Sequence, residues 1–199
     1  MSRRCSRLLS AGLTLVEMLV GVAIVGVLLA VATPSLTNMM ERRRVVATAG
    51  EVASFFAQAR SESAIQEGYR VHLHMEPVPA SVGAFSCLRL STAANTDVCG
   101  CDRPASQLCA VGQGRLLREY VLPHASSVRF AVDETVARWG WSDYLVAFTR
   151  GAYPTDVSDI RIVVKGVKSN ALLHVEFNNA GRVRTCSPDG SIGGFPACS

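Results

Sequence analysis

Residues 13–33 of the chain read LTLVEMLVGVAIVGVLLAVAT, and this stretch decides the fold class. It is apolar apart from one charge, Glu17, and its 21 residues are enough to cross a bilayer as a helix. Twelve of them are Leu, Ile or Val, which contribute roughly −5 kcal/mol to insertion, more than one acid near the end of the span costs. The sequence therefore predicts a transmembrane helix over residues 13–33.

Three arginines precede the apolar run, Arg3, Arg4 and Arg7, and they lie in a short leader formed by residues 1–12. Positive charge beside a membrane span stays on the cytoplasmic side. We therefore expect the chain to cross a membrane once, with its N-terminus in the cytoplasm and the residues after 33 outside.

Other interpretations of the same segment compete with a lasting membrane helix. The Ala-Val-Ala sequence at 30–32 resembles a signal-peptide cleavage site, but the apolar run is long, contains an acid and is followed by Pro34. A lipoprotein signal requires a cysteine after Gly12, where this chain has Leu13. A plain single-pass anchor remains open, although it gives no reason for an acid at a depth where ionisable groups usually have a functional partner.

A basic leader ending in Gly12, then Leu13-Thr14-Leu15-Val16-Glu17 and an apolar helix with Pro34 near its end, resembles the signature of type IV pilins and pseudopilins. The resemblance implies cleavage after Gly12 by a prepilin peptidase, N-methylation of Leu13, and packing with other pilins into a filament. The family usually has Phe in place of Leu13, and Leu keeps this position hydrophobic. In such a bundle the new amino terminus of a neighbouring subunit would neutralise Glu17, because an unpaired acid is costly in an apolar core.

After Pro34 the pattern becomes amphipathic and keeps helical spacing until Gly68 offers a stop. We predict that the helix continues out of the membrane over residues 34–67 and packs its far half on a domain formed by residues 68–199. The sequence AQARSESA at 57–64, followed by Gly68, resembles the GspH/FimT branch of pseudopilins.

Beyond Gly68 apolar residues alternate with polar ones, as in half-buried strands. Short runs of this kind occur at residues 69–75, 85–90, 128–132, 144–148, 160–164 and 172–177. The apolar face of the antiparallel sheet that they form needs a cover, and the apolar stripe of the helix can supply it. The sequence predicts an α+β fold, and the resemblance makes this a type IV pilin-like fold with a long N-terminal helix.

The composition excludes two broad classes of protein. Hydrophobic residues make up 49% of the 199 residues and charged residues 18%, which is too apolar for an intrinsically disordered chain. The formal charge is +4, from 20 cations against 16 acids, and three of the cations belong to the leader. The remainder is too balanced to coat nucleic acid over its whole surface, so a nucleic-acid site would have to be local.

Six of the seven cysteines follow the membrane segment, and an even number on the outer side indicates disulfides. Cys186 and Cys198 stand apart near the C-terminus and are expected to pair, closing a loop worth roughly 3 kcal/mol. The other four are expected to cross-link the loop from residue 81 to residue 114. They are Cys87, Cys99, Cys101 and Cys109.

Two groups of residues offer metal ligands. A zinc site formed by the cysteines at 99–109 would lack the paired CxxC spacing and would lie in an oxidising compartment. His72, His74 and Glu76 share one face of a predicted strand, but two histidines without a fixed third ligand are usually surface residues. We therefore expect no metal and no cofactor.

The segment from 172 to 186 has the pattern of a strand, a turn and a returning strand. Arg182 and Arg184 are two residues apart, so their stems leave one face about 6.5 to 7 Å apart, a spacing suited to successive phosphates. Two arginines on a solvent-facing strand are also ordinary surface residues. Three further cations are close in sequence, Arg161, Lys165 and Lys168.

The sequence Gly181-Arg182-Val183-Arg184, followed by a tail bracketed by cysteines, resembles the GRxR motif of the FimT family. Members of that family bind DNA during natural transformation through type IV pili. The resemblance implies that Arg182 and Arg184 contact phosphates, that Gly181 makes the turn, and that DNA is a partner. Lys165 and Lys168 are expected to add charge to the same site.

The predicted function is that of a DNA-binding minor pseudopilin, in the inner membrane before assembly and in the periplasm and the cell-surface pilus afterwards. The alternative is a structural minor pseudopilin of a type II secretion system or of a pilus-priming complex, without DNA binding. The sequence contains no nucleophile elbow, HExxH or P-loop, so an enzyme is not expected.

Overall fold

The structure of the chain is a computed structural model. It describes residues 14–65, 70–75, 86–93, 115–123, 125–133, 146–148, 160–178 and 180–198. Its contacts divide it into two compact units, Met1–Met39 and Met40–Ser199. One helix, α1 (Leu15–Ile65), contributes to both units and is the long N-terminal helix that the sequence predicts.

The first unit is helical from residue 15 onward. Thr14 caps the helix, because its hydroxyl oxygen accepts the Glu17 amide at 3.2 Å and its carbonyl accepts the Met18 amide at 3.2 Å. The large apolar side chains of this part that the structure describes are all exposed, from Leu15 at 76% to Met39 at 49%. Such a surface is stable in lipid or against other apolar helices, and not in water.

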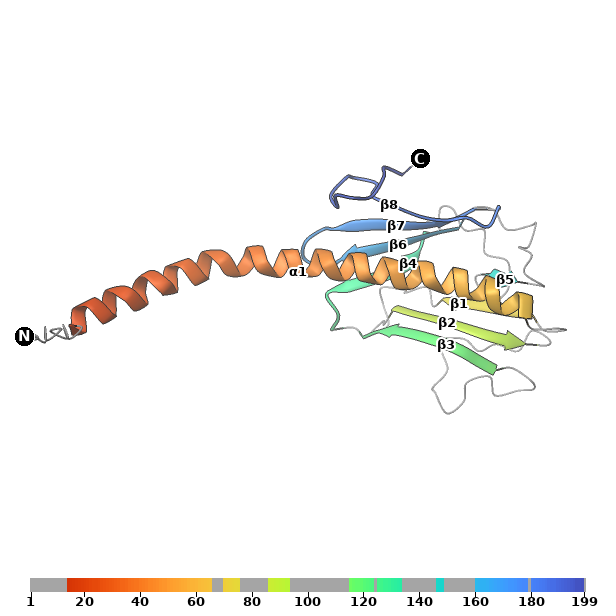
Figure 1. The fold of residues 1–199 in the computed structure, drawn as a ribbon, viewed down its shortest axis with the longest axis horizontal. Helices are drawn as coiled ribbons and strands as arrows, with labels where there is room; N and C mark the ends of the chain where they lie inside the picture. The colour runs from red at the N-terminus through yellow and green to blue at the C-terminus, as the bar shows by residue number, and fades with distance from the viewer. Residues whose placement is uncertain are drawn as a thin grey trace, which may run out of the picture. The chain divides into compact units, whose positions relative to one another are not determined.

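The second unit contains two four-stranded antiparallel sheets, where the sequence suggested a single sheet. The sheet orders are β3-β2-β1-β5 and β4-β6-β7-β8. The bounds are β1 (Arg70–Met75), β2 (Ser86–Ala93), β3 (Arg115–Leu122), β4 (Val128–Val132), β5 (Val146–Phe148), β6 (Ile160–Gly166), β7 (Leu172–Phe177) and β8 (Val183–Cys186). Figure 1 shows the C-terminal part of α1 running across both sheets.

The core lies between this part of α1 and the inner faces of the two sheets. The buried helix positions are Val45, Ala49, Val52, Phe55, Phe56 and Ala59. Phe56 stacks on Phe177 of β7 with ring centroids 4.8 Å apart, and Phe177 also meets Phe148 of β5 at 6.1 Å. The amphipathic stripe of the helix therefore covers both sheets, as expected for an α+β fold.

Among the strands that the structure describes, β3 is the one that the sequence pattern did not predict. Its sequence RLLREYVL lacks strict alternation, and most of its side chains are only partly buried, as at the edge of a sheet. Arg118 attaches it to α1: its guanidinium lies 4.3 Å from the ring centroid of Phe55 and donates to Glu51 at 2.6 Å and to Gln58 at 3.0 Å. A tertiary contact, rather than local periodicity, holds this strand in place.

Candidate nucleic-acid interface

The β7–β8 hairpin carries the two arginines of the predicted motif. The Gly181 amide donates to the Asn178 carbonyl at 2.8 Å, and the Asn178 amide donates to the Arg182 carbonyl at 3.1 Å. Gly181 has a φ of 76°, a left-handed conformation that glycine adopts at little steric cost. The Arg182 amide donates to Asn178 Oδ1 at 2.9 Å, so side chain and backbone together close the turn.

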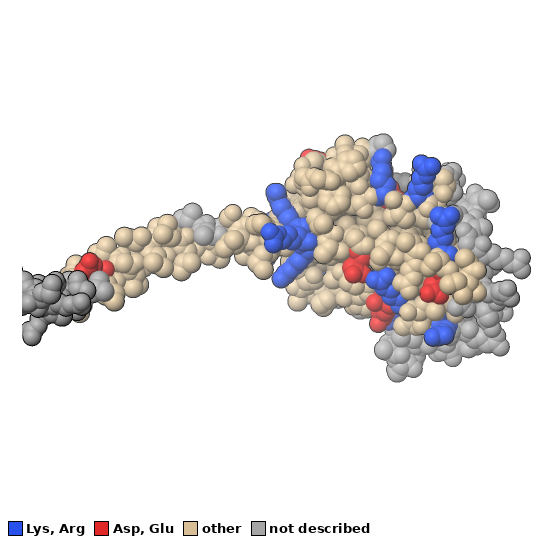
Figure 2. Space-filling view, viewed as in Figure 1, with Lys and Arg blue, Asp and Glu red and all other residues tan. Residues whose placement is uncertain are grey.

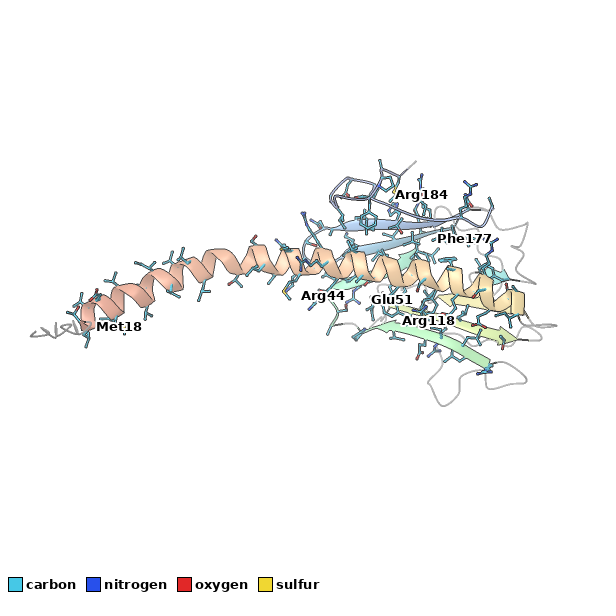
Figure 3. All side chains as sticks on the ribbon, viewed as in Figure 1. Met18, Arg44, Glu51, Arg118, Phe177 and Arg184 are labelled. Atoms are coloured by element: carbon cyan, nitrogen blue, oxygen red, sulfur yellow. A yellow bond between two sulfur atoms is a disulfide. The ribbon has the colours of Figure 1, made fainter. Side chains whose placement is uncertain are left out.

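Both arginines lie on the outer face of the second sheet. Glu176 points outward because its neighbours on β7, Val175 and Phe177, are buried in the core. Arg184 is paired with Glu176 in the strand register and shares its face, and Arg182 lies two residues earlier. Both arginine side chains are exposed. Figure 2 shows cationic side chains at the margin of the domain where Figure 1 places β7 and β8, and Figure 3 labels Arg184 there.

One carboxylate connects three strands of this face. Glu176 Oε1 accepts a hydrogen bond from Arg161 Nε of β6 at 3.1 Å, and Glu176 Oε2 accepts one from Arg184 Nη2 at 2.9 Å. Arg161 Nη1 also lies 3.5 Å from Asp133 Oδ2, just after β4. The exposed fraction rises from 17% for the Glu176 side chain to 28% for Arg161 and 43% for Arg184, so Arg184 is the member most open to solvent.

The C-terminal tail folds back on this hairpin. Cys186 and Cys198 form a disulfide, which confirms the predicted pairing. The Ser187 amide donates to the Pro196 carbonyl at 2.9 Å, and Cys198 Sγ lies 3.7 Å from His174 Nδ1. The tail thus covers His174 at one end of β8 and leaves Arg184 exposed near the other end.

Four side chains of this region bring potential metal-binding atoms within 4.8 Å of one another: His174, Glu176, Cys186 and Cys198. The two sulfur atoms are joined to each other, so neither is a thiolate that could bind a metal. Both Glu176 oxygens already accept hydrogen bonds from arginines. His174 is the one remaining donor of the four, and a single histidine does not hold a metal ion in the disulfide-bonded protein.

The structure places both predicted lysines toward the β6–β7 turn, away from the Gly181 end of the sheet. Lys165 lies on the outer face of β6 opposite Leu172, four residues along β7 from Glu176, which is about 13 Å. Lys168 belongs to the turn after β6, at the end of the sheet opposite to Gly181, and its amide donates to Glu41 Oε1 at 2.8 Å. Lys168 is therefore not brought to the arginine pair, because the β6–β7 and β7–β8 turns lie at opposite ends of β7.

The remaining site predictions fall mostly outside the described residues. Cys87 is buried in β2 and disulfide-bonded. β2 confirms the strand predicted at residues 85–90, so the segment from 81 to 114 is not one loop throughout. Cys99, Cys101, Cys109 and Glu76 lie outside the described residues, as do Gly12 and Leu13. For His72 and His74 the structure describes the β1 backbone alone.

Residues 7–33 match a family model described as the prokaryotic N-terminal methylation motif. No curated protein and no solved structure matches the chain. Among the described residues, α1 is the one helix long and apolar enough to cross a membrane. The motif, the apolar helix and the antiparallel sheets indicate a type IV pilin-like protein with an α+β fold.

Membership of this class bears on the role, the partners and the location of the protein. The motif supports a pilin or pseudopilin role, in a family that is typically structural, and indicates interaction with other pilins and with a prepilin peptidase. Together with the apolar helix, it fits a protein anchored in a membrane before assembly.

Proposed function

We propose that this chain is a minor pseudopilin of the GspH/FimT family, most similar to FimT, that binds DNA without sequence preference during natural transformation. The observation that carries the proposal is the placement of Arg182 and Arg184 side by side on the exposed outer face of an edge hairpin. Two further cations lie on the same sheet, since Arg129 and Lys165 stand opposite each other on β4 and β6.

The hairpin suits phosphate binding because it is already ordered before DNA arrives. The Gly181 turn fixes one end of β8, and the Cys186–Cys198 disulfide fixes the other. A rigid platform loses less entropy on binding, and a guanidinium group can donate two parallel hydrogen bonds to one phosphate. Contacts of this kind position DNA without reading its bases, so we expect sequence-independent binding.

The four cations of the predicted site are expected to contribute unequally to phosphate binding. Arg182 and Arg184 are the primary phosphate contacts. Lys165 is about 13 Å from the level of Arg184 along the strands, about two phosphate spacings, and can contact a further phosphate of the same backbone. Lys168 lies beyond the far end of β6 and contributes through its net charge alone.

The proposal is tested by gel-shift titration of the full chain in a non-ionic detergent across a salt series. With two or three phosphates neutralised, log K should fall against log salt with a slope of about −2 to −3. The R182Q/R184Q variant should lose most of the affinity and most of the slope, because both strong phosphate contacts are removed. Random double-stranded fragments of different sequence should bind alike.

A matched control removes two exposed arginines elsewhere. Arg42 and Arg43 lie on the exposed face of α1, and R42Q/R43Q changes the net charge by the same amount as R182Q/R184Q. The control should retain nearly full affinity. Equal retardation of DNA by R182Q/R184Q and the parent protein would show that the hairpin is not the binding site.

The structural alternative is favoured by one observation, the ion pairing of Arg184 with Glu176, which an ordinary surface would also show. In that case the chain primes or caps a pilus, or serves a type II secretion system. A deletion strain separates the two: loss of DNA uptake with secretion intact supports the DNA-binding proposal, whereas loss of exoprotein secretion supports the alternative.

A further inference from the structure

Glu176 occupies the place beside Arg184 that an incoming phosphate would take. It offers Arg184 an anionic oxygen at 2.9 Å and is itself only 17% exposed. We propose that Glu176 is a built-in competitor of DNA, which sets the affinity of the hairpin, and that Arg161 is the positioning residue that governs how strongly it competes. This inference rests on the proposed DNA-binding function.

The competition follows from charge and geometry. A carboxylate at hydrogen-bond distance neutralises much of the positive charge of Arg184, so a phosphate gains less from approaching that guanidinium. Glu176 also stands close to the position of the bound phosphate and repels it. Arg182, one position beyond the register pairs of β7 and β8, lies at the level of Asn178, a neutral residue.

Arg161 contacts the Glu176 carboxylate from β6, the neighbour of β7 on the side opposite to β8. It donates from Nε to Glu176 Oε1 at 3.1 Å, so the charge of Glu176 is shared between two arginines on its two neighbouring strands. Arg161 also forms an ion pair with Asp133, whose Oδ2 lies 3.5 Å from Arg161 Nη1. Arg161 is less exposed than Arg184, so it need not contact DNA. Its hydrogen bond orients the Glu176 carboxylate and partly neutralises its negative charge.

The first test is E176Q in the full chain, titrated with double-stranded DNA in non-ionic detergent. Glutamine keeps the shape and one acceptor oxygen but removes the charge. We expect the affinity at low salt to rise about fivefold, the factor that corresponds to one unit charge at close range in water. The salt slope should steepen by up to about 0.9, because the contact between Arg184 and its phosphate is then no longer weakened by Glu176.

The matched control is E51Q. Glu51 is an exposed carboxylate on α1 that pairs with Arg118 at 2.6 Å, so this change also removes one negative charge and releases one arginine. It lies on a different face of the unit, against the first sheet. E51Q should change the affinity by less than about twofold and leave the slope unaltered.

The second test is R161Q, made alone and together with E176Q. R161Q alone should weaken DNA binding, because Glu176 then has Arg184 as its one remaining arginine partner of the two and neutralises it more fully. In the E176Q background it should leave the salt slope within about 0.3 of that of E176Q, since Arg161 itself meets no phosphate. A direct phosphate contact by Arg161 would instead lower the slope by about 0.9 in both backgrounds.

The outcomes separate this inference from the proposed function. If R182Q/R184Q abolishes binding while E176Q and E51Q both match the parent protein, the hairpin binds DNA and Glu176 is not a competitor. A loss of affinity in E176Q, in protein with a native circular dichroism spectrum, would mean that Glu176 orients Arg184 and would overturn the inference. Unchanged binding by R182Q/R184Q would remove the proposed function itself.

Discussion

His174 is a partly buried histidine on the outer face of β7, between Glu176 along the strand and the disulfide. Burial lowers the pKa of His174, because the charged ring loses hydration, and the positive charge of Arg161 lowers it further. The nearby carboxylates of Glu176, Asp133 and Asp189 raise it without reversing the shift. The ring is therefore held neutral beside the Cys186–Cys198 bridge.

This shift predicts how the stability of the second unit depends on pH. In the unfolded chain His174 takes up a proton near pH 6.5, whereas the folded state binds it only at lower pH, so the free energy of unfolding falls as pH decreases below about 6.5. The loss cannot exceed about 1.4 kcal/mol per pH unit for one group. Denaturant titrations of the parent protein and H174Q between pH 5 and 7.5 should give a smaller pH dependence for H174Q. Parallel curves would contradict the assignment.

At the scale of elements, Glu41 fastens α1 to the turn between β6 and β7. It is 3% exposed, and Oε1 accepts hydrogen bonds from the Lys168 amide at 2.8 Å and from the Ser169 amide and hydroxyl at 2.9 Å each. Burial by itself would raise the pKa of Glu41, but these hydrogen bonds outweigh it and the pKa is lowered. Gly166 leaves room for this carboxylate, because a β-carbon there would collide with Glu41 Oε1.

The E41Q variant should therefore be less stable. Glutamine replaces three charge-assisted hydrogen bonds by weaker neutral ones, and we expect the free energy of unfolding to fall by about 1 to 3 kcal/mol at pH 7. The difference from the parent protein should disappear as the pH falls through the lowered pKa of Glu41, since protonation removes the charge there too. E51Q, which removes an exposed ion pair, should cost less than about 1 kcal/mol in the same denaturation experiment. An equal cost for both variants would assign no special role to Glu41.

The β7–β8 hairpin and the Glu41 contact show which features a local pattern can predict and which it cannot. The β7–β8 hairpin carries its turn chemistry and its alternation in one short segment, and both appear in the structure. Glu41 and its partners Lys168 and Ser169 are 127 and 128 residues apart, so no local signal joins them. The Thr14-x-x-Glu17 spacing that begins α1 is a local capping signal, and it could have been used to place the start of the helix.

At the scale of the whole molecule, the first unit exposes an apolar helix surface that includes Glu17, an exposed acid in the first turn of α1. In a type IV pilin-like protein such a surface is expected to be covered by lipid before assembly and by other subunits afterwards.

The E17A variant tests whether Glu17 acts in assembly. Insertion should be unchanged or improved, because removal of an acid favours the apolar segment, whereas incorporation into filaments should fall sharply if a neighbouring amino terminus needs this carboxylate. Membrane fractionation and quantification of the protein in sheared filaments measure the two effects. T14A, expected to cost about 1 kcal/mol of helix capping, controls for damage to the helix start. Filaments that take up E17A normally would contradict the pairing.

Local sequence alone determined the class of this protein, through an apolar run with a basic leader, an amphipathic helix and alternating strands. Each of these is a pattern among neighbouring residues, with the periodicity of a helix or of a strand. It also determined the hairpin turn and the C-terminal disulfide, because their partners are close in the chain. The tertiary structure decided the division into two sheets, the fastening of β3 and of the β6–β7 turn to α1, and the pairing of Arg184 and Arg161 with one carboxylate. These depend on contacts between different elements, made when α1 packs on the sheets and when neighbouring strands pair in one register, and no local period encodes them.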